Sequence, residues 1–148
     1  MADIKSPEDR SQNMAAIRSK DTKPEIYLRK LLFSKGLRYR KNVSYIPGHP
    51  DIWLKKYNAA IFVNGCFWHR HQGCKYAYMP KSREEFWQDK FKKNIQRDER
   101  VRMELQKSGI RCLVVWECTV NKMKKEKEDQ TLKQICCFLG SDSMYLEI

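Results

Sequence analysis

The sequence predicts a single α/β domain in which helices flank a central mixed sheet. Amphipathic, capped segments and short apolar runs follow one another in the order helix, strand, hairpin, helix, strand and helix. With 148 residues, of which 41% are hydrophobic, the chain is long enough to bury one core. It contains no repeat and no low-complexity linker, so residues 1–148 are expected to form one domain.

Two helix starts lie in the first quarter of the chain. Ser6-Pro7-Glu8-Asp9 predicts a short helix with Met14 on its apolar face, which would dock on the core or on a ligand. Thr22-Lys23-Pro24-Glu25 is a capping box, in which Thr22 accepts from the first-turn backbone and Glu25 reaches back. We expect this second helix to end at Gly36 and to bury Ile26, Leu28, Leu31 and Leu32.

Three strand candidates follow. Residues 37–43 lead into the break at Pro47-Gly48-His49-Pro50. Residues 51–54 and 59–63 are separated by a polar turn and predict a hairpin. Antiparallel pairing would bring Asp51 back beside Val63 at one edge of the sheet.

The second half of the chain supplies two helices and a strand. Ser82-Arg83-Glu84-Glu85 is a second capping box, and its helix should run to Lys107 before Gly109 stops it. The continuous apolar run at 110–116 predicts a strand that is buried on both faces. We expect the long helix to bury Phe86, Phe91, Ile95, Met103 and Leu105, the last helix to bury Leu132, Ile135, Cys136, Phe138 and Leu139, and Cys112, Cys136 and Cys137 to be small core residues.

Charge and cysteine usage restrict the class of partner. Thirty Lys and Arg against 18 Asp and Glu give a net charge of +12, which favours a nucleic acid over a membrane, because no basic amphipathic helix stands out. A merely soluble basic protein is the alternative. No apolar run approaches membrane-spanning length, and six cysteines without an export signal indicate a reducing cytosol.

The segment from Val63 to Cys74 concentrates the residues that bind metals. Cys66, His71 and Cys74 have Cys-x4-His-x2-Cys spacing, and thiolate and imidazole are zinc ligands. A structural zinc needs a fourth ligand, for which Cys118 after the apolar run at 113–117 is the best candidate. The alternative is a set of buried thiols with a solvated histidine. His69 is left over as a packed neighbour or a proton-transfer group.

An oxygen-ligand site is expected at the base of the hairpin. Asp51 can bind Mg²⁺ there, with the Val63 carbonyl as a second oxygen. A turn-forming acid after Pro50 is an equally good explanation of Asp51 from spacing alone. Glu25 is fully explained by its capping box, and a catalytic role is the second interpretation.

Two resemblances add to these patterns. A catalytic acid at a hairpin base after a helix resembles the restriction-endonuclease-like PD-(D/E)xK nucleases, although Phe62-Val63-Asn64 stands where their acid-x-Lys would be. Residues 9–138 more closely resemble the very-short-patch repair (Vsr) DNA mismatch endonucleases. This resemblance rests on Ser11-Gln-Asn-Met14, Lys20-Asp-Thr22-Lys-Pro-Glu25, Pro47-Gly-His-Pro-Asp51, Asn64-Gly-Cys-Phe-Trp-His69, Glu85-Phe-Trp87 and Val115-Trp-Glu-Cys118.

The Vsr resemblance implies an enzyme that nicks one DNA strand 5′ to the thymine of a T·G mismatch. Asp51 would hold Mg²⁺ with the Val63 carbonyl. Glu25 would reach the water shell of the metal, and His69 would donate a proton or position water beside the scissile phosphate. Some relatives carry His in place of Asn64, and some have one residue fewer than Gln72-Gly73 before the next cysteine.

The same resemblance implies a zinc site, a wedge and a cellular setting. Phe67, Trp68 and Trp87 would enter the base stack, while Met14 in an N-terminal helical arm, residues 1–20, would enter from the other groove. A structural zinc would be held by Cys66, His71, Cys74 and Cys118. The enzyme would be a cytoplasmic, nucleoid-associated monomer with mismatch-repair or DNA-methylation partners. The alternatives are a restriction-type nuclease for matched duplex and a non-catalytic zinc module that binds DNA.

Overall fold

A computed structural model describes residues 21–148, which fold around one five-stranded mixed sheet in the order β1-β2-β3-β4-β5. The expected helix after Ser6, the contact at Met14 and the DNA-binding arm at 1–20 lie outside the described residues. The strands are β1 (Arg40–Lys41), β2 (Ile52–Leu54), β3 (Ala59–Asn64), β4 (Arg111–Trp116) and β5 (Tyr145–Glu147). The mixed α/β class is therefore confirmed.

The hairpin expected at 51–63 is present and forms the antiparallel half of the sheet. β2 pairs with β3 in the register Ile52↔Ile61, and β1 pairs antiparallel with β2. The turn between β2 and β3 is a 3₁₀ segment, Lys55–Tyr57, closed by Asn58 in the left-handed region. β4 and β5 then add in parallel to β3 and β4, which completes the mixed sheet.

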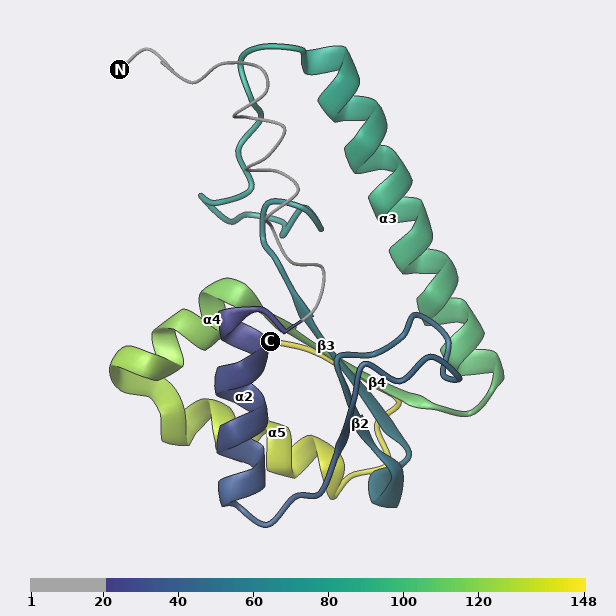
Figure 1. Cartoon of the computed structure of the whole chain (residues 1–148), viewed down its shortest axis with the longest axis vertical. Coiled ribbons are helices and arrows are strands. Elements are labelled where there is room, and N and C mark those ends of the chain that lie inside the picture. The colour runs from purple at the N-terminus through teal and green to yellow at the C-terminus, as the bar shows by residue number, and fades with distance from the viewer. Residues whose placement is uncertain (1–20) are drawn as a thin grey trace.

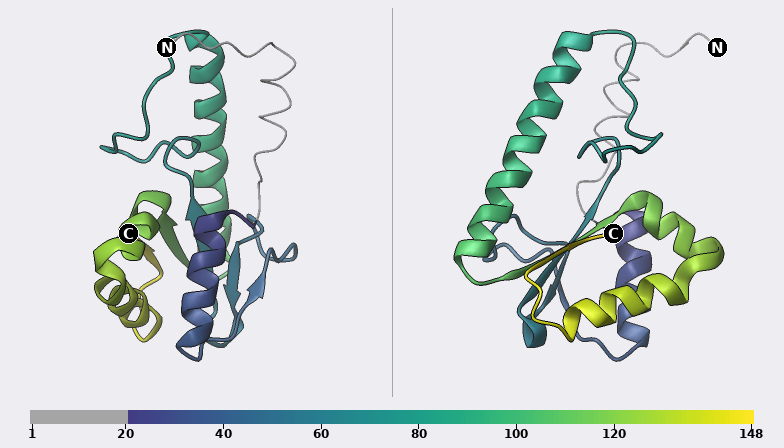
Figure 2. Two further views of the ribbon diagram at one scale, coloured as in Figure 1. Left: turned by 60° about the vertical axis from the view of Figure 1, so that its left-hand side comes forward. Right: turned by 180° about the vertical axis from the view of Figure 1, so that it is seen from behind.

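Helices cover the two faces of the sheet unequally. One face packs against α2 (Lys23–Ser34), α4 (Glu117–Lys122) and α5 (Glu128–Leu139), with a π-helical segment, Met123–Lys127, joining the last two. The long helix α3 (Glu84–Lys107) lies on the opposite side, as Figures 1 and 2 show. Side chains of β4 alternate between the two cores, so the expectation that this strand is buried on both faces is confirmed.

The helix α3 corrects two expectations. It does end at Lys107, but its N-cap is Arg83 in the left-handed conformation, without a side-chain cap in the described chain, so the Ser82 capping box is wrong. Only Phe91 and Leu105 are buried, whereas Phe86, Ile95 and Met103 are exposed by 46%, 40% and 58%. The N-terminal part of α3 projects beyond the sheet (Figure 1), which leaves Phe86 exposed, while Met103 lies about 200° around the helix from the buried Leu105.

Smaller corrections concern segments whose structure depends on packing partners that are distant in sequence. The strand expected at 37–43 is reduced to β1, the helical region from α4 to α5 is longer than expected, and β5 was not predicted. Ile26 is exposed because it lies about 200° around α2 from Leu28, which packs in the core. Cys136 and Cys137 are exposed as well, since Leu132, Ile135, Phe138 and Leu139 form the packed face of α5; Cys112 is buried as expected.

A membrane-spanning helix is absent from residues 21–148, because none of their helices combines the necessary length with sufficient apolar character.

Gly48 gives a test of how α3 packs against the hairpin. At φ +82° it lies so close to its neighbours that an added Cβ would meet Val101 Cγ1 at 2.4 Å. Gly36, at φ +88°, has no such neighbour within 4 Å among the described residues. We expect Gly48→Ala to lose about 1–3 kcal/mol more unfolding free energy than Gly36→Ala in urea denaturation, because only the first adds overpacking to backbone strain. Equal losses would show that Val101 on α3 moves aside without a measurable cost in unfolding free energy.

Candidate functional site

A groove of about 2280 Å³ runs between the sheet, the loop after β3 and the helix α3. Its lining includes Glu25, Asp51 and His69, three residues that come from α2, the start of β2 and the loop. Basic side chains line it as well, among them Lys75, Lys90, Arg97, Arg100 and Arg102. Further acids, Asp98, Glu99, Glu104, Glu117 and Glu147, lie among them, so the groove mixes cationic side chains that can contact phosphates with carboxylates that can hold a divalent cation.

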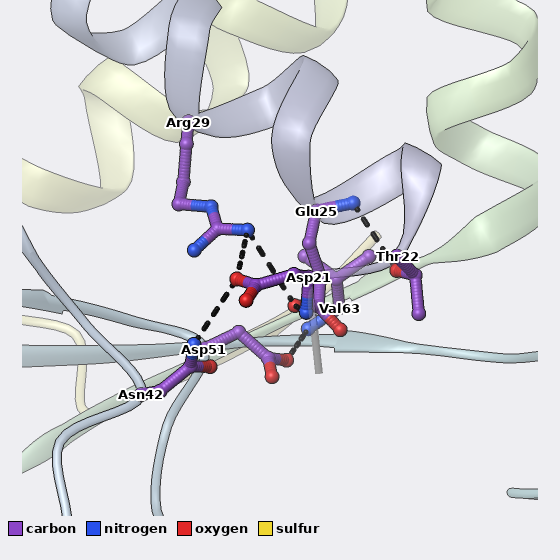
Figure 3. Close-up of polar contacts among 7 residues, drawn as sticks. All are labelled: Asp21, Thr22, Glu25, Arg29, Asn42, Asp51 and Val63. Atoms are coloured by element: carbon purple, nitrogen blue, oxygen red, sulfur yellow. Dashed lines mark hydrogen bonds and ion pairs between the residues drawn. The ribbon is translucent and has the colours of Figure 1, made fainter. Parts of the chain in front are cut away.

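Asp51 is fixed at the base of the hairpin by a backbone hydrogen bond. Its Oδ2 accepts from the Val63 N–H at 2.7 Å (Figure 3). The N–H and C=O of one strand residue point to the same side, so the Val63 carbonyl also faces the Asp51 side of β3. Burial and, second, the negative charge of Glu25 raise the pKa of Asp51 to about 7. The predicted proximity of Asp51 and Val63 is confirmed.

Glu25 is the second acid of the groove, and its capping box is also present. Thr22 Oγ1 accepts from the Glu25 N–H at 3.4 Å, while Glu25 Oε2 accepts from the Asp21 N–H at 2.8 Å. The side chain is almost completely buried, and burial raises its pKa. A cap alone would not require burial beside another acid, so the environment of Glu25 favours a role in the groove.

A network behind the two acids was missed by sequence reasoning. Arg29 lies one turn after Glu25 and pairs with Asp21 at 2.8 Å and with Glu25 at 3.9 Å. Asn42 Nδ2 also donates to Asp21 (Figure 3). The one signal in the sequence was an arginine at the i+4 position from Glu25, next to the predicted apolar face.

His69 faces the groove from the loop and is held by an acid on α3. Its Nδ1 lies 2.7 Å from Asp98 Oδ2, and the ring is partly exposed. Because Asp98 engages Nδ1, Nε2 is the nitrogen left for a ligand. His69 and Asp51 line the same groove. Sequence reasoning did not find Asp98, since 28 residues separate it from His69.

The four residues expected to hold zinc converge on one point. The ligand atoms of Cys66, His71, Cys74 and Cys118 all lie within 4.8 Å of one another, so the cluster can hold a metal ion. His71 Nδ1 faces Cys66 Sγ at 3.6 Å and Cys118 Sγ at 3.4 Å. Cys118 belongs to the first turn of α4 rather than to a strand end.

The surroundings of this cluster suit a metal in two ways. The His71 ring stacks on Trp116, with centroids 4.2 Å apart and planes 7° from parallel, which fixes its orientation. Burial lowers the pKa of His71 and so favours the neutral imidazole that coordinates metals. Burial raises the pKa of Cys66 to about 12, so without a cation its thiol stays protonated.

The three predicted wedge aromatics lie together where the loop meets α3. The Phe67 ring contacts Trp68 at 5.2 Å, Trp87 at 5.6 Å and the buried Phe91 at 5.2 Å between centroids. Trp68 and Trp87 also contact each other and remain partly exposed. Asn94 Nδ2 donates to the Trp68 carbonyl and ties the loop to α3. These rings form one aromatic patch, made of Phe67, Trp68 and Trp87, of which Trp68 lines the groove.

Comparison with known proteins agrees with this geometry. The family model described as DNA mismatch endonuclease Vsr matches residues 2–75. The DNA mismatch endonuclease Vsr of Escherichia coli is 39% identical over 146 residues, covering 97% of this chain and 93% of its own. The Type II nicking enzyme V.NmeAIP of Neisseria meningitidis is 48% identical over 118 residues, covering 80% and 84%. V.XorIIP of Xanthomonas oryzae, another Type II nicking enzyme, is 43% identical over 121 residues, covering 82% and 88%. The chain therefore belongs to the Vsr family of DNA mismatch endonucleases.

Proposed function

We propose that this protein is a Mg²⁺-dependent endonuclease that nicks one strand of duplex DNA 5′ to the thymine of a T·G mismatch. Relatives named as a mismatch endonuclease and as nicking enzymes support DNA cleavage as the reaction class. The observation that carries the proposal is the convergence of Asp51, Glu25 and His69 on one groove that Lys and Arg side chains also line. Two carboxylates and an imidazole there supply what phosphodiester hydrolysis needs from side chains.

We further propose that the fold is restriction-endonuclease-like. The supporting features are an antiparallel hairpin with an acid at its base, followed by a long helix and a parallel strand, β4, next to β3. Asp51 occupies the position of the acid in such a hairpin. Asn64, at the end of β3, lies on the groove lining but supplies neither a charge nor a proton-transfer group.

Asp51 and the Val63 carbonyl would hold the magnesium ion, and Glu25 would bind water around it. Carboxylate and carbonyl oxygens are the donors that Mg²⁺ prefers, so the residues present fit this ion. Magnesium there would offset the charge on the phosphate and lower the pKa of a bound water. The hydrogen bond from Val63 keeps the Asp51 carboxylate in place.

His69 would move the proton in this reaction. Asp98 holds Nδ1, so Nε2 can donate to the leaving oxygen or orient water beside the scissile phosphate. A carboxylate behind the imidazole fixes its tautomer and its orientation. Asp98 is therefore proposed as the positioning partner of His69.

Zinc is the proposed ion for Cys66, His71, Cys74 and Cys118. Three thiolates and one imidazole are a typical structural zinc set, and four protein ligands leave no open position for catalysis. Such a zinc would join the loop to α4 and hold Trp68 of the aromatic patch at the groove.

The aromatic patch of Phe67, Trp68 and Trp87 is the proposed wedge. A mismatched pair is poorly stacked, so inserting rings beside it costs less than at a matched pair. The Lys and Arg side chains of the groove would supply affinity for any DNA, and the wedge would supply the preference for T·G. Insertion of Met14, action as a monomer, nucleoid association and repair or methylation partners stay predictions.

The decisive test compares duplexes that differ by one T·G pair. With Mg²⁺, wild-type protein should nick only the thymine strand of the mismatched duplex, and Asp51→Asn should bind that duplex but not cleave it, because the amide lacks the charge that holds the metal. Gel assays of cleavage and binding measure both. Double-strand cleavage of matched DNA would instead support a restriction-type nuclease, and binding that Mg²⁺ does not alter would support a non-catalytic module.

A stability measurement checks that Asp51→Asn is folded. Because the folded-state pKa of Asp51 is raised to about 7, its ionised form destabilises the metal-free fold, and this cost is complete above that pH. In Mg²⁺-free buffer, the variant should gain more unfolding free energy relative to wild type at about pH 8 than at about pH 5.5. A gain that is independent of pH would contradict the raised pKa.

Removing one cysteine of the cluster tests the zinc assignment. A structural zinc contributes about 10–16 kcal/mol in small metal domains, comparable to the whole stability of a domain, so Cys118→Ala should lose most of its zinc and unfold much of the domain. The exposed Cys136 provides the control, and Cys136→Ala should keep one zinc per chain. Atomic absorption and thermal melting give the two readouts. Full zinc content in Cys118→Ala would refute the four-ligand site.

Trp68→Ala tests the wedge. Stacking of one ring on a base contributes about 1–3 kcal/mol, so the preference for mismatched over matched duplex should fall roughly tenfold while the melting temperature changes little. Phe33, an exposed aromatic on α2 that does not line the groove, is the control, and Phe33→Ala should keep the preference. If Trp68→Ala melts early and still prefers T·G, the ring belongs to the core.

A further inference from the structure

We propose that Arg29 is a positioning residue of the acidic site. Its buried guanidinium would hold Asp21 behind the site and orient Glu25, so that Glu25 and Asp51 face the groove as a pair for one divalent cation. This inference rests on the proposed function, because it gives Arg29 a role toward the magnesium ion proposed there.

The acids of the network differ in whether they line the groove. Glu25 and Asp51 line the groove, whereas Asp21 and Arg29 do not. Arg29 Nη2 lies 2.8 Å from Asp21 Oδ1 and 3.9 Å from Glu25 Oε2, so one nitrogen bridges the two carboxylates (Figure 3). Asn42, which lines the groove, donates to the same Asp21 oxygen. Asp21 is thus held by Arg29 and Asn42, while Glu25 and Asp51 are the acids that line the groove.

The burial of Arg29 also destabilises the fold. Arg29 is 4% exposed, and its Nη1 is the one buried side-chain nitrogen or oxygen without a hydrogen-bond partner in the described part of the chain. A buried donor without a partner destabilises a fold, and a packed apolar side chain would avoid that penalty. The presence of Arg29 at this position despite the penalty indicates that its guanidinium has a role in the site that it contacts.

The charges of the network match one divalent cation. Asp21, Glu25, Asp51 and Arg29 together carry two negative charges when all four are ionised, and one Mg²⁺ neutralises them. Without Arg29 the surplus would be three, which by itself would attract a cation more strongly, so a loss of affinity would come from Glu25 losing one of the two groups that orient its carboxylate, the other being the Asp21 N–H. Partners that orient the ligands of a metal site are therefore expected to affect affinity without touching the ion.

Three variants of zinc-loaded protein test this role. Arg29→Met removes the charge and the bridge, Arg29→Lys keeps the charge without the planar fork, and Lys30→Met removes a charge from the next, exposed residue of α2. The readouts are Mn²⁺ binding by electron paramagnetic resonance, half-saturating Mg²⁺ for nicking, the nicking rate at saturating Mg²⁺, and thermal melting.

We expect Arg29→Met to weaken Mn²⁺ binding and raise half-saturating Mg²⁺ by about 10–100-fold, as removal of a partner behind the ligands does in other metal sites. The rate at saturating Mg²⁺ should fall much less. Arg29→Lys should lie between Arg29→Met and wild type, and Lys30→Met should match wild type. A merely structural Arg29 would change melting and leave metal affinity unaltered.

The proposal is refuted if folded Arg29→Met binds Mn²⁺ as wild type does, or if Lys30→Met loses as much affinity. If Arg29→Met does not fold, the double variant Asp21→Asn/Arg29→Met takes its place, because it removes both charges of the closest ion pair. Wild-type affinity for Mn²⁺ in this double variant, or in Arg29→Lys, would also refute the proposal. Wild-type protein that binds Mn²⁺ but does not nick T·G DNA would refute the proposed function alone. Absence of Mn²⁺ binding by wild type would refute both.

Discussion

The hydrogen bond from the Val63 N–H to Asp51 is the contact around which the groove is built. It exists because β2 and β3 pair with Ile52 opposite Ile61, so the chain entering β2 returns beside the end of β3. A shift of one residue would turn Asp51 to the other face and bury it in a core. The register of one short hairpin therefore decides whether the carboxylate meets the groove at all.

Two anchors then hold the loop after β3 against this carboxylate. The Cys66, His71, Cys74 and Cys118 cluster joins the loop to α4, while His69 contacts Asp98 and the Trp68 carbonyl contacts Asn94 on α3. Cys118 of α4 is far from the loop in sequence, and Asn94 and Asp98 lie well inside α3, so the loop bridges two helices that lie on opposite sides of the sheet (Figure 2). An irregular segment needs such anchors to keep its side chains in place relative to the rest of the fold.

The projecting half of α3 explains the exposed apolar residues that a helix on a core would not have. Its C-terminal part packs Leu105 on the sheet, whereas its N-terminal part meets the loop through Phe91. Between them, Asp98 and the basic Arg97, Arg100 and Arg102 line the groove. One helix thus serves as core, as wall of the groove and as support of the aromatic patch.

The sequence by itself determined whatever depends on residues close together in the chain. The Thr22 and Glu25 capping box, the hairpin that returns Asp51 to Val63 and the Cys66 to Cys74 spacing are local patterns, and each is present in the structure. The tertiary structure alone decided which parts of α3 are covered, that Asp98 engages His69, that Arg29 bridges two acids and that β5 adds to the sheet. These features require segments far apart in sequence to meet. Local periodicity predicts whether a segment is a helix or a strand. The packing of the whole domain decides which face of that segment is buried.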